Sequence, residues 1–175
     1  MKSFIGKFWY ILLAILVLIA LAIFYFARPS HDRFGKDHPI PEGLEYSIPL
    51  DSTSTAAADS LDSSTWLILR NGIQGGIYNY DFYYGPLPAG EIFLRCFEAN
   101  DNIPLSIDRI EERSKVAIDS TASFAQLVSK QEFTIYEGEW EDYYAALIEV
   151  WHRDAATKQE KKLLEKVYRV EGWMR

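Results

Sequence analysis

The sequence predicts a mainly β protein, an antiparallel β-sandwich domain tethered to one N-terminal transmembrane helix. Two observations support this fold class. Residues 8–27 form an apolar run of 20 residues without a charge. After residue 65, short segments alternate apolar and polar side chains and are separated by Gly, Pro and Asn, a pattern typical of antiparallel strands joined by turns. We therefore expect an extracytoplasmic β-sandwich domain at residues 65–175.

The apolar run at residues 8–27 has the length of a membrane span. At about 1.5 Å per residue, its 20 residues would extend roughly 30 Å as a helix, the thickness of a bilayer hydrocarbon core. Aromatic side chains, which prefer the headgroup regions, mark both ends of the run. They are Phe8, Trp9, Tyr10, Phe24, Tyr25 and Phe26. We expect this segment to anchor the chain in a membrane, with residues 1–7 as a short cytoplasmic tail.

The charges around the run leave its orientation nearly balanced. Lys2, Lys7 and the amino terminus precede it, and three basic residues follow it. The acid-free basic segment before the run is the layout of an uncleaved signal-anchor. The alternative is a cleaved signal peptide, because Ala20-Leu21-Ala22 has the small-x-small pattern, although four bulky apolar residues follow directly. In either case, the bulk of the chain is expected outside the cytoplasm.

Charge and cysteine content narrow the possible classes of protein. Residues 1–37 hold five of the 18 basic and two of the 25 acidic residues, so the remainder carries 23 acidic against 13 basic side chains. Such a surface repels phosphate backbones, and we expect no nucleic-acid partner. The one cysteine, Cys96, allows no intrachain disulfide. Its position in the apolar run EIFLRCF predicts a thiol packed in the core.

Residues 28–64 have the composition of a stalk and flexible linker. Three prolines interrupt RPSHDRFGKDHPIPEG, and DSTSTAAADSLDSS at residues 51–64 holds few bulky apolar groups. Between them, LEYSIPL at residues 44–50 alternates and is either a first strand or part of the tether. We place the start of the compact domain near Thr65.

From Thr65 the pattern changes to period two. In GIYNYDFYYG, Tyr78, Tyr80, Phe82 and Tyr84 fall on one face of a strand. TWLILRN before it and GEIFLRCFEA after it are rich in β-branched or aromatic residues, and the turn compositions NGIQGG and GPLPAG separate the three segments. Three successive antiparallel strands are expected.

The middle of the domain departs from this alternation. Residues 103–115, IPLSIDRIEERSK, have apolar residues at a helical spacing behind a proline. Residues 122–130, ASFAQLVSK, are compatible with one or two helical turns. We therefore expect short helical segments here.

The C-terminal part returns to period two and predicts a long hairpin. Its strands are YYAALIEVWHR and KKLLEKVYRVEGW, with DAATKQE as the connecting loop. Pairing outward from the loop, with Arg153 against Lys161, would place Glu149 opposite Glu165. Because like charges are unfavourable in directly opposed positions, we expect a shifted or bulged register.

The stretch EGEWEDYYAALIEVWH, residues 137–152, raises the question of acid-based chemistry. Four acids in its first six residues lie between two predicted strands, with Gly138 in the turn, so a solvated connection is the favoured interpretation. A Ca²⁺ loop needs oxygen ligands at fixed offsets, and the DxDxDG pattern is missing. Paired catalytic carboxylates need one acid in an apolar pocket and a partner about 5–10 Å away, and they remain the alternative.

Other motifs for chemistry are weak. His152 has no histidine at i+4 and no cysteine partner, and the other two histidines, His31 and His38, lie in the expected stalk. NGIQGG matches neither phosphate-binding glycine pattern, and GxSxG is missing. We expect no catalytic residue, no metal and no cofactor.

Aromatic residues are the remaining candidates for a functional surface. The domain holds Trp66, Trp140, Trp151 and Trp173 besides many Tyr and Phe, and core packing is the favoured interpretation. The alternative is an exposed platform for a partner protein or for sugar rings, centred beside the acidic turn. The candidate partner-binding residues are Glu139, Trp140, Glu141, Asp142, Tyr143 and Tyr144.

The stretch from GEIFLRCFEAN through FTIYEGEW and YYAALIEVWHR to the terminal EGWMR resembles a group of small, uncharacterised, single-span envelope proteins of Gram-negative bacteria. The resemblance implies a location and carries no activity. We therefore expect a membrane-anchored, non-enzymatic interaction module of the periplasm, bound to the inner membrane through residues 8–27 and to an envelope protein or glycan. The alternatives are a carbohydrate-binding domain and, third, a carboxylate-dependent hydrolase.

Overall fold

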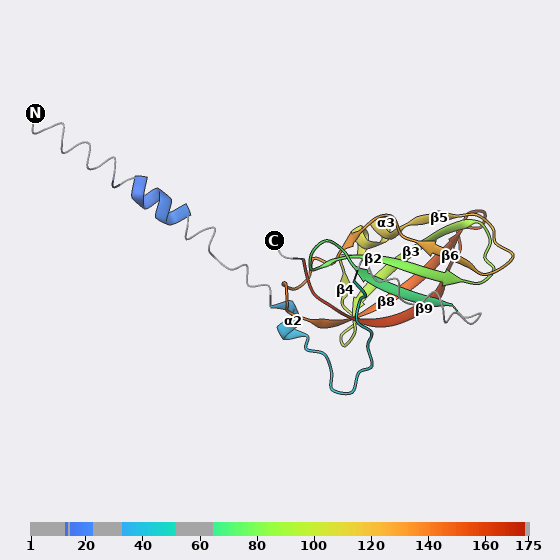
Figure 1. Ribbon diagram of the computed structural model, residues 1–175, viewed down its shortest axis with the longest axis horizontal. Helices are drawn as coiled ribbons and strands as arrows, with labels where there is room; N and C mark the ends of the chain where they lie inside the picture. Colours follow the sequence, from blue (N-terminus) through green and yellow to red (C-terminus); the bar gives the residue numbers. More distant parts are fainter. Residues whose placement is uncertain (1–12, 14, 23–32, 52–64, 174–175) are drawn as a thin grey trace, which may run out of the picture. The chain divides into compact units, whose positions relative to one another are not determined.

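The computed structural model describes residues 13, 15–22, 33–51 and 65–173 (Figure 1). The chain divides into two compact units, Met1–His31 and Asp32–Arg175. In the first unit residues 15–22 are helical, and the expected span at residues 8–27 lies largely outside the described residues. No helix within the described ranges is both long and apolar enough to cross a membrane.

The second unit is built from two antiparallel sheets packed face to face, so the prediction of a mainly β, sandwich-like domain is confirmed. One sheet has the order β1-β2-β6, with β7 also pairing with β2; its strands are β1 (Trp66–Asn71), β2 (Ile77–Tyr84), β6 (Ala125–Val128) and β7 (Phe133–Thr134). The other has the order β4-β3-β8-β9, with β5 also pairing with β3; its strands are β3 (Gly90–Glu98), β4 (Pro104–Leu105), β5 (Val116–Ile118), β8 (Tyr144–Asp154) and β9 (Glu160–Val170).

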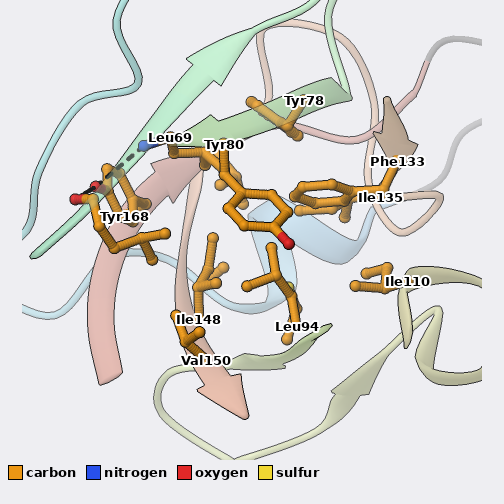
Figure 2. Close-up of a cluster of buried hydrophobic side chains, with 14 of the residues drawn as sticks. Leu69, Tyr78, Tyr80, Leu94, Ile110, Phe133, Ile135, Ile148, Val150 and Tyr168 are labelled. Atoms are coloured by element: carbon orange, nitrogen blue, oxygen red, sulfur yellow. Dashed lines mark hydrogen bonds between the residues drawn. The ribbon is translucent and has the colours of Figure 1, made fainter. Parts of the chain in front are cut away.

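The core lies between the sheets and combines Leu, Ile and Val side chains with large Tyr and Phe rings (Figure 2). The alternation predicted for β2 is confirmed, because Tyr78, Tyr80, Phe82 and Tyr84 are all buried. Cys96 is also fully buried, as expected. The core packing expected for the aromatic residues holds for these Tyr and Phe, whereas Trp66, Trp151 and Trp173 are half-buried and Trp140 is exposed.

The strand order differs from the expected run of three successive strands. β1 and β2 form the predicted antiparallel pair, from Trp66 against Tyr83 to Asn71 against Tyr78. β3 instead crosses to the second sheet, where it pairs with β8 over nine residues. The loop before β3 contains Pro86 and Pro88, which have no N–H to donate to a ladder. The other edge of β2 pairs with β6 and β7.

The middle segment holds one of its two expected helices. Helix α3 (Ile107–Ser114) lies within the predicted range 103–115. The helical turns predicted for residues 122–130 are wrong, because this segment forms β6 and pairs with β2. Leu127 is buried between the exposed side chains of Gln126 and Val128, which is the alternation of a strand. This alternation covers too few residues to be recognised in the sequence.

The described part of the predicted stalk, residues 33–51, belongs to the second compact unit instead of extending from it. Helix α2 (Phe34–Asp37) packs Phe34 against the core, 5.1 Å from the ring of Tyr144. Farther along, Ser47 exchanges two backbone hydrogen bonds of 2.9 Å with β9, and Leu50 exchanges bonds of 2.9 and 2.8 Å with β1. These contacts join the segment to an edge strand of each sheet. They involve only the main chain, so they require no strong pattern of apolar side chains in the segment. Residues 52–64 lie outside the described residues.

The β8–β9 hairpin contains the expected irregularity, a register shift between Val150 and Trp151. Arg153 faces Glu160 across the strands, yet Glu149 still faces Glu165. Lys162 offsets the repulsion between these two carboxylates, because its ammonium lies 2.8 Å from the Glu149 carboxylate and 2.7 Å from that of Glu165.

Candidate functional site: the aromatic turn

The candidate site is the loop between β7 and β8, and we call residues 139–143 the aromatic turn. Two residues in this loop have left-handed backbone conformations, Gly138 with φ 90° and Glu141 with φ 62°. Glycine adopts positive φ without strain, so Gly138 lets the chain reverse directly before β8. The backbone N–H of Glu141 donates to the Glu171 carboxylate at 2.6 Å, which ties the tip of the turn to the end of β9.

Two aromatic side chains of the turn face solvent. Trp140 is 54% exposed and Tyr143 is 42% exposed. The Trp140 indole lies against Gly75 in the β1–β2 connection, where a Cβ would come within 2.6 Å of it. The guanidinium of Arg169 lies 4.6 Å from the centre of the Tyr143 ring. Both rings are therefore held in place while much of their apolar surface remains open.

The acids near the turn have different environments. Glu141 is exposed, as expected for a solvated turn. Asp142 packs its carboxyl group against Gly35 of α2, and its Oδ2 is buried without a hydrogen-bond partner among the described residues. Glu139 is half-buried. The turn is thus solvated on one side only, and α2 covers part of the other.

Glu137 has a structural role that its sequence position did not indicate. Its carboxylate accepts hydrogen bonds from the backbone N–H of Ser106 at 3.0 Å and from the Ser106 hydroxyl at 2.7 Å. Ser106 has φ 39° and directly precedes α3, so Glu137 fixes the entry to that helix. Glu137 therefore holds the segment before the aromatic turn against the start of α3, and it is not part of the exposed surface of the turn.

Tyr144 is the candidate residue that the structure places elsewhere. Its side chain is fully buried in the core, and its hydroxyl donates to the backbone oxygen of Glu137 at 2.8 Å. The change from exposed Tyr143 to buried Tyr144 marks the first inward position of β8. Tyr144 therefore anchors the turn and cannot contact a partner.

Residues from the expected tether extend the exposed surface next to the turn. Tyr46 is 41% exposed and Ile48 is 56% exposed. Ser47 between them pairs with the inward-facing Tyr168, so alternation directs Tyr46 and Ile48 to the outer face that also carries Arg169. The sequence does not indicate this pair, because the pattern of residues 44–50 fits either a strand or a tether.

A second group of aromatic rings lies on the outer face of the other sheet. Trp66 stacks on Tyr83 with ring centres 5.6 Å apart, and Tyr83 stacks on Phe124 at 5.5 Å. Because the rings stack face against face, much of each flat surface is covered by its neighbour. This row is a less suitable platform for a flat ligand than the half-exposed indole of Trp140.

One group of His, Cys, Asp and Glu side chains among the described residues comes close enough to surround a metal ion. It consists of His38, Glu98 and Asp101, whose ligand atoms lie within 4.8 Å of one another. His38 Nδ1 lies 3.2 Å from the Asp101 carboxylate. The buried Glu98 carboxylate accepts backbone N–H groups of Asn100 and Asp101 at 2.9 and 2.6 Å. These hydrogen bonds account for the arrangement, which joins the end of α2 to the β3–β4 turn.

Comparison with models of protein families, with curated proteins and with solved structures finds no match for this chain.

Proposed function

We propose that this chain is a membrane-anchored, non-enzymatic interaction module of the bacterial envelope. Residues 8–27 would anchor it in the inner membrane, and the two-sheet domain would bind its partner in the periplasm. The observation that carries the binding role is the exposure of Trp140 and Tyr143 together on one short turn. Large aromatic side chains on a fixed backbone are typical binding hot spots, because little conformational entropy is lost when they are covered.

The charges beside the aromatic turn favour a partner with basic and apolar groups. Glu141 is exposed at the tip, Glu139 is half-exposed, and the chain as a whole has a net charge of −7. Acids at the rim of an interface mainly accelerate encounter with a cationic partner and make binding sensitive to salt. Tyr46 and Ile48 would add apolar contact area on the neighbouring outer face.

The partner-binding role predicts that the double substitution Trp140→Ala and Tyr143→Ala abolishes capture of the partner. Loss of an aromatic hot spot costs about 2 kcal/mol or more, or roughly 30-fold in affinity. The measurement is crosslinking of the intact protein in its native membrane, followed by identification of the captured molecules. Val128→Ala is the control, since Val128 is 56% exposed on β6, outside the aromatic turn. Equal capture by the double variant and the control would contradict this role.

Carbohydrate binding is the second candidate, favoured by the open indole of Trp140 beside exposed acids. Sugar rings stack on aromatic faces, and carboxylates accept hydrogen bonds from their hydroxyls. Glycan-array binding that is lost in Trp140→Ala would support this candidate over a protein partner.

The proposed location predicts the result of fusion experiments. Alkaline phosphatase fused after Arg175 should be active, because the C-terminus would lie in the oxidising periplasm. A fluorescent protein that matures only in the cytoplasm should be dark at the same position. The opposite pair of results would invert the topology.

A further inference from the structure

A groove of about 640 Å³ lies between α3 and the segment that carries β7, and its lining includes no residue of the aromatic turn. One wall is formed by Arg109, Glu112 and Arg113 of α3, and the facing residues include Glu132, Thr134 and Tyr136. Its volume falls within the range of roughly 300–1,000 Å³ that is typical of small-molecule sites.

The opposite side of α3 fixes the helix, so that its arginines face the groove. Ile110 and Ser114 are fully buried. The Ser114 hydroxyl donates to the Ile110 carbonyl at 2.6 Å and accepts the backbone N–H of Leu94 at 2.9 Å. The Ser114 carbonyl accepts the Tyr80 hydroxyl at 2.7 Å. These bonds connect α3 to both sheets, and the groove wall is therefore a rigid element.

The two arginines in this wall differ from most arginines of the domain. Arg70 lies 2.7 Å from Asp81, and Arg95 and Arg153 each contact the carboxylate of Glu111. Among the side chains that the structure describes, no carboxylate lies within salt-bridge distance of Arg109 or Arg113, although the groove itself contains two glutamates. Arg109 instead rests on the Tyr136 ring, 4.8 Å from its centre, which holds the guanidinium in one orientation.

We propose that this groove binds a small ligand through a single carboxylate or phosphate group held between Arg109 and Arg113. Side chains four residues apart on a helix lie about 5–6 Å apart at Cβ, so one anion can bridge both guanidinium groups. Each guanidinium can donate two parallel hydrogen bonds to such an anion, which also relieves the repulsion between the two cations. Glu112 and Glu132 disfavour a polyanion and can accept hydrogen bonds from the rest of the ligand.

The test is a titration of the full chain in mild detergent. Binding is monitored through the NMR signals of the arginine side-chain Nε–H groups. N-acetylglycine supplies a carboxylate beside an amide, and inorganic phosphate supplies the other anion, so the two series show which chemistry the groove prefers. We expect saturable shifts of the Arg109 and Arg113 signals with at least one probe at millimolar concentration. The double variant Arg109→Gln and Arg113→Gln lacks both reporter groups, so its binding is followed through the backbone amide signals of residues 109–113, and it should lose at least about tenfold in affinity.

Two controls keep the result specific. Arg169→Gln removes a half-buried guanidinium that lies over Tyr143 on another surface, and it should leave the affinity unchanged. Arg113→Lys keeps the charge but lacks the planar fork, and it should bind more weakly than the wild type. Superimposable backbone amide spectra show that a variant is folded. Shifts that fail to saturate up to about 20 mM of either probe, or equal affinity in the double variant, would overturn the proposal.

Discussion

Replacing Gly172 with alanine is expected to destabilise the domain by about 3 kcal/mol or more, one of the largest effects of any single methyl group in the chain. A Cβ at this position would lie 2.3 Å from the carbonyl oxygens of Glu137 and Gly138 and 2.3 Å from the Gly138 carbonyl carbon. These are backbone atoms, which cannot rotate away as a flexible side chain would. The chain after β9 must therefore separate from the loop that leads into the aromatic turn.

The destabilisation should extend beyond Gly172, because backbone hydrogen bonds beside this contact hold one end of the domain together. The Trp173 N–H donates to the Ile135 carbonyl at 2.8 Å, and the Ile135 N–H donates to the Gly76 carbonyl at 2.9 Å. Gly76 has φ 74° and lies so close to Trp173 that its own Cβ would be 2.2 Å from the Trp173 nitrogen. Displacing Gly172 disturbs this backbone ladder and the support of the aromatic turn together.

Denaturant unfolding of the full chain in detergent measures the loss, with Gly85→Ala as the matched control. A Cβ on Gly85 would meet only the Phe124 ring, at an ordinary contact distance of 3.6 Å. This control should change the free energy of unfolding by less than about 1 kcal/mol, since alanine also restricts the unfolded chain. Similar stabilities of the two variants would show that the contact at Gly172 is not required for the fold.

The sequence was most informative where side chains alternate over a long strand. β2 and β8 run for eight and 11 residues, and their inward residues could be identified because one face of each is consistently apolar. β6 has only four residues and β7 has two, too few to establish a period. The assignment of β3 to the second sheet depends on pairing with β8, about 55 residues later, which local patterns do not encode.

The candidate site was predicted in part for the same reasons. The position of the turn follows from acids and glycine between two strands, and Trp140 and Tyr143 are exposed within it. The burial of Tyr144 could have been inferred from the phase of β8, since Ala146, Ile148 and Val150 share its face. The hydrogen bonds from Ser106 to Glu137 and the packing of Gly35 against Asp142 could not have been inferred. Each is a contact with a segment about 30 residues or more away in the sequence.

Alkaline unfolding should begin soon after pH 10, because three core tyrosines must remain protonated in the fold. Burial is the largest cause in each case: it raises the pKa values of Tyr78 and Tyr80 well above the ordinary 10.0, and that of Tyr168 to about 12. Their hydroxyl groups are also used as donors: Tyr80 donates to the Ser114 carbonyl at 2.7 Å and Tyr168 to the Leu67 carbonyl at 2.7 Å. Ionisation would remove these protons from buried sites.

The sign of the effect follows from proton binding. Above pH 10 the unfolded chain releases these three protons and the folded chain retains them, so folding stability is fully present below pH 10 and falls as the pH rises. Each retained proton costs about 1.4 kcal/mol per pH unit, so the three tyrosines contribute about 4 kcal/mol per unit, and the Cys96 thiol, whose pKa burial also raises, adds to the loss. Lys166 acts in the opposite direction at lower pH, because burial lowers its pKa and the folded chain releases its proton first. The three tyrosines outweigh it above pH 10.

Denaturant unfolding of the full chain in detergent at a series of alkaline pH values tests the prediction, with tyrosinate absorbance recorded in parallel. The tyrosinate signal of the core should appear together with the loss of near-ultraviolet circular dichroism, within roughly two to three pH units above 10, since domains of this kind have about 5–15 kcal/mol to lose. Tyr80→Phe removes one of these groups, so it should reduce the slope of stability against pH by about 1.4 kcal/mol per pH unit even if its stability at neutral pH is lower. Tyr143→Phe, at a 42% exposed position, should leave the slope unchanged. Full ionisation of all tyrosines near pH 10 with the fold intact would mean that the hydroxyls of Tyr78, Tyr80 and Tyr168 are accessible to solvent, and that the two sheets do not enclose the core as closely as their packing indicates.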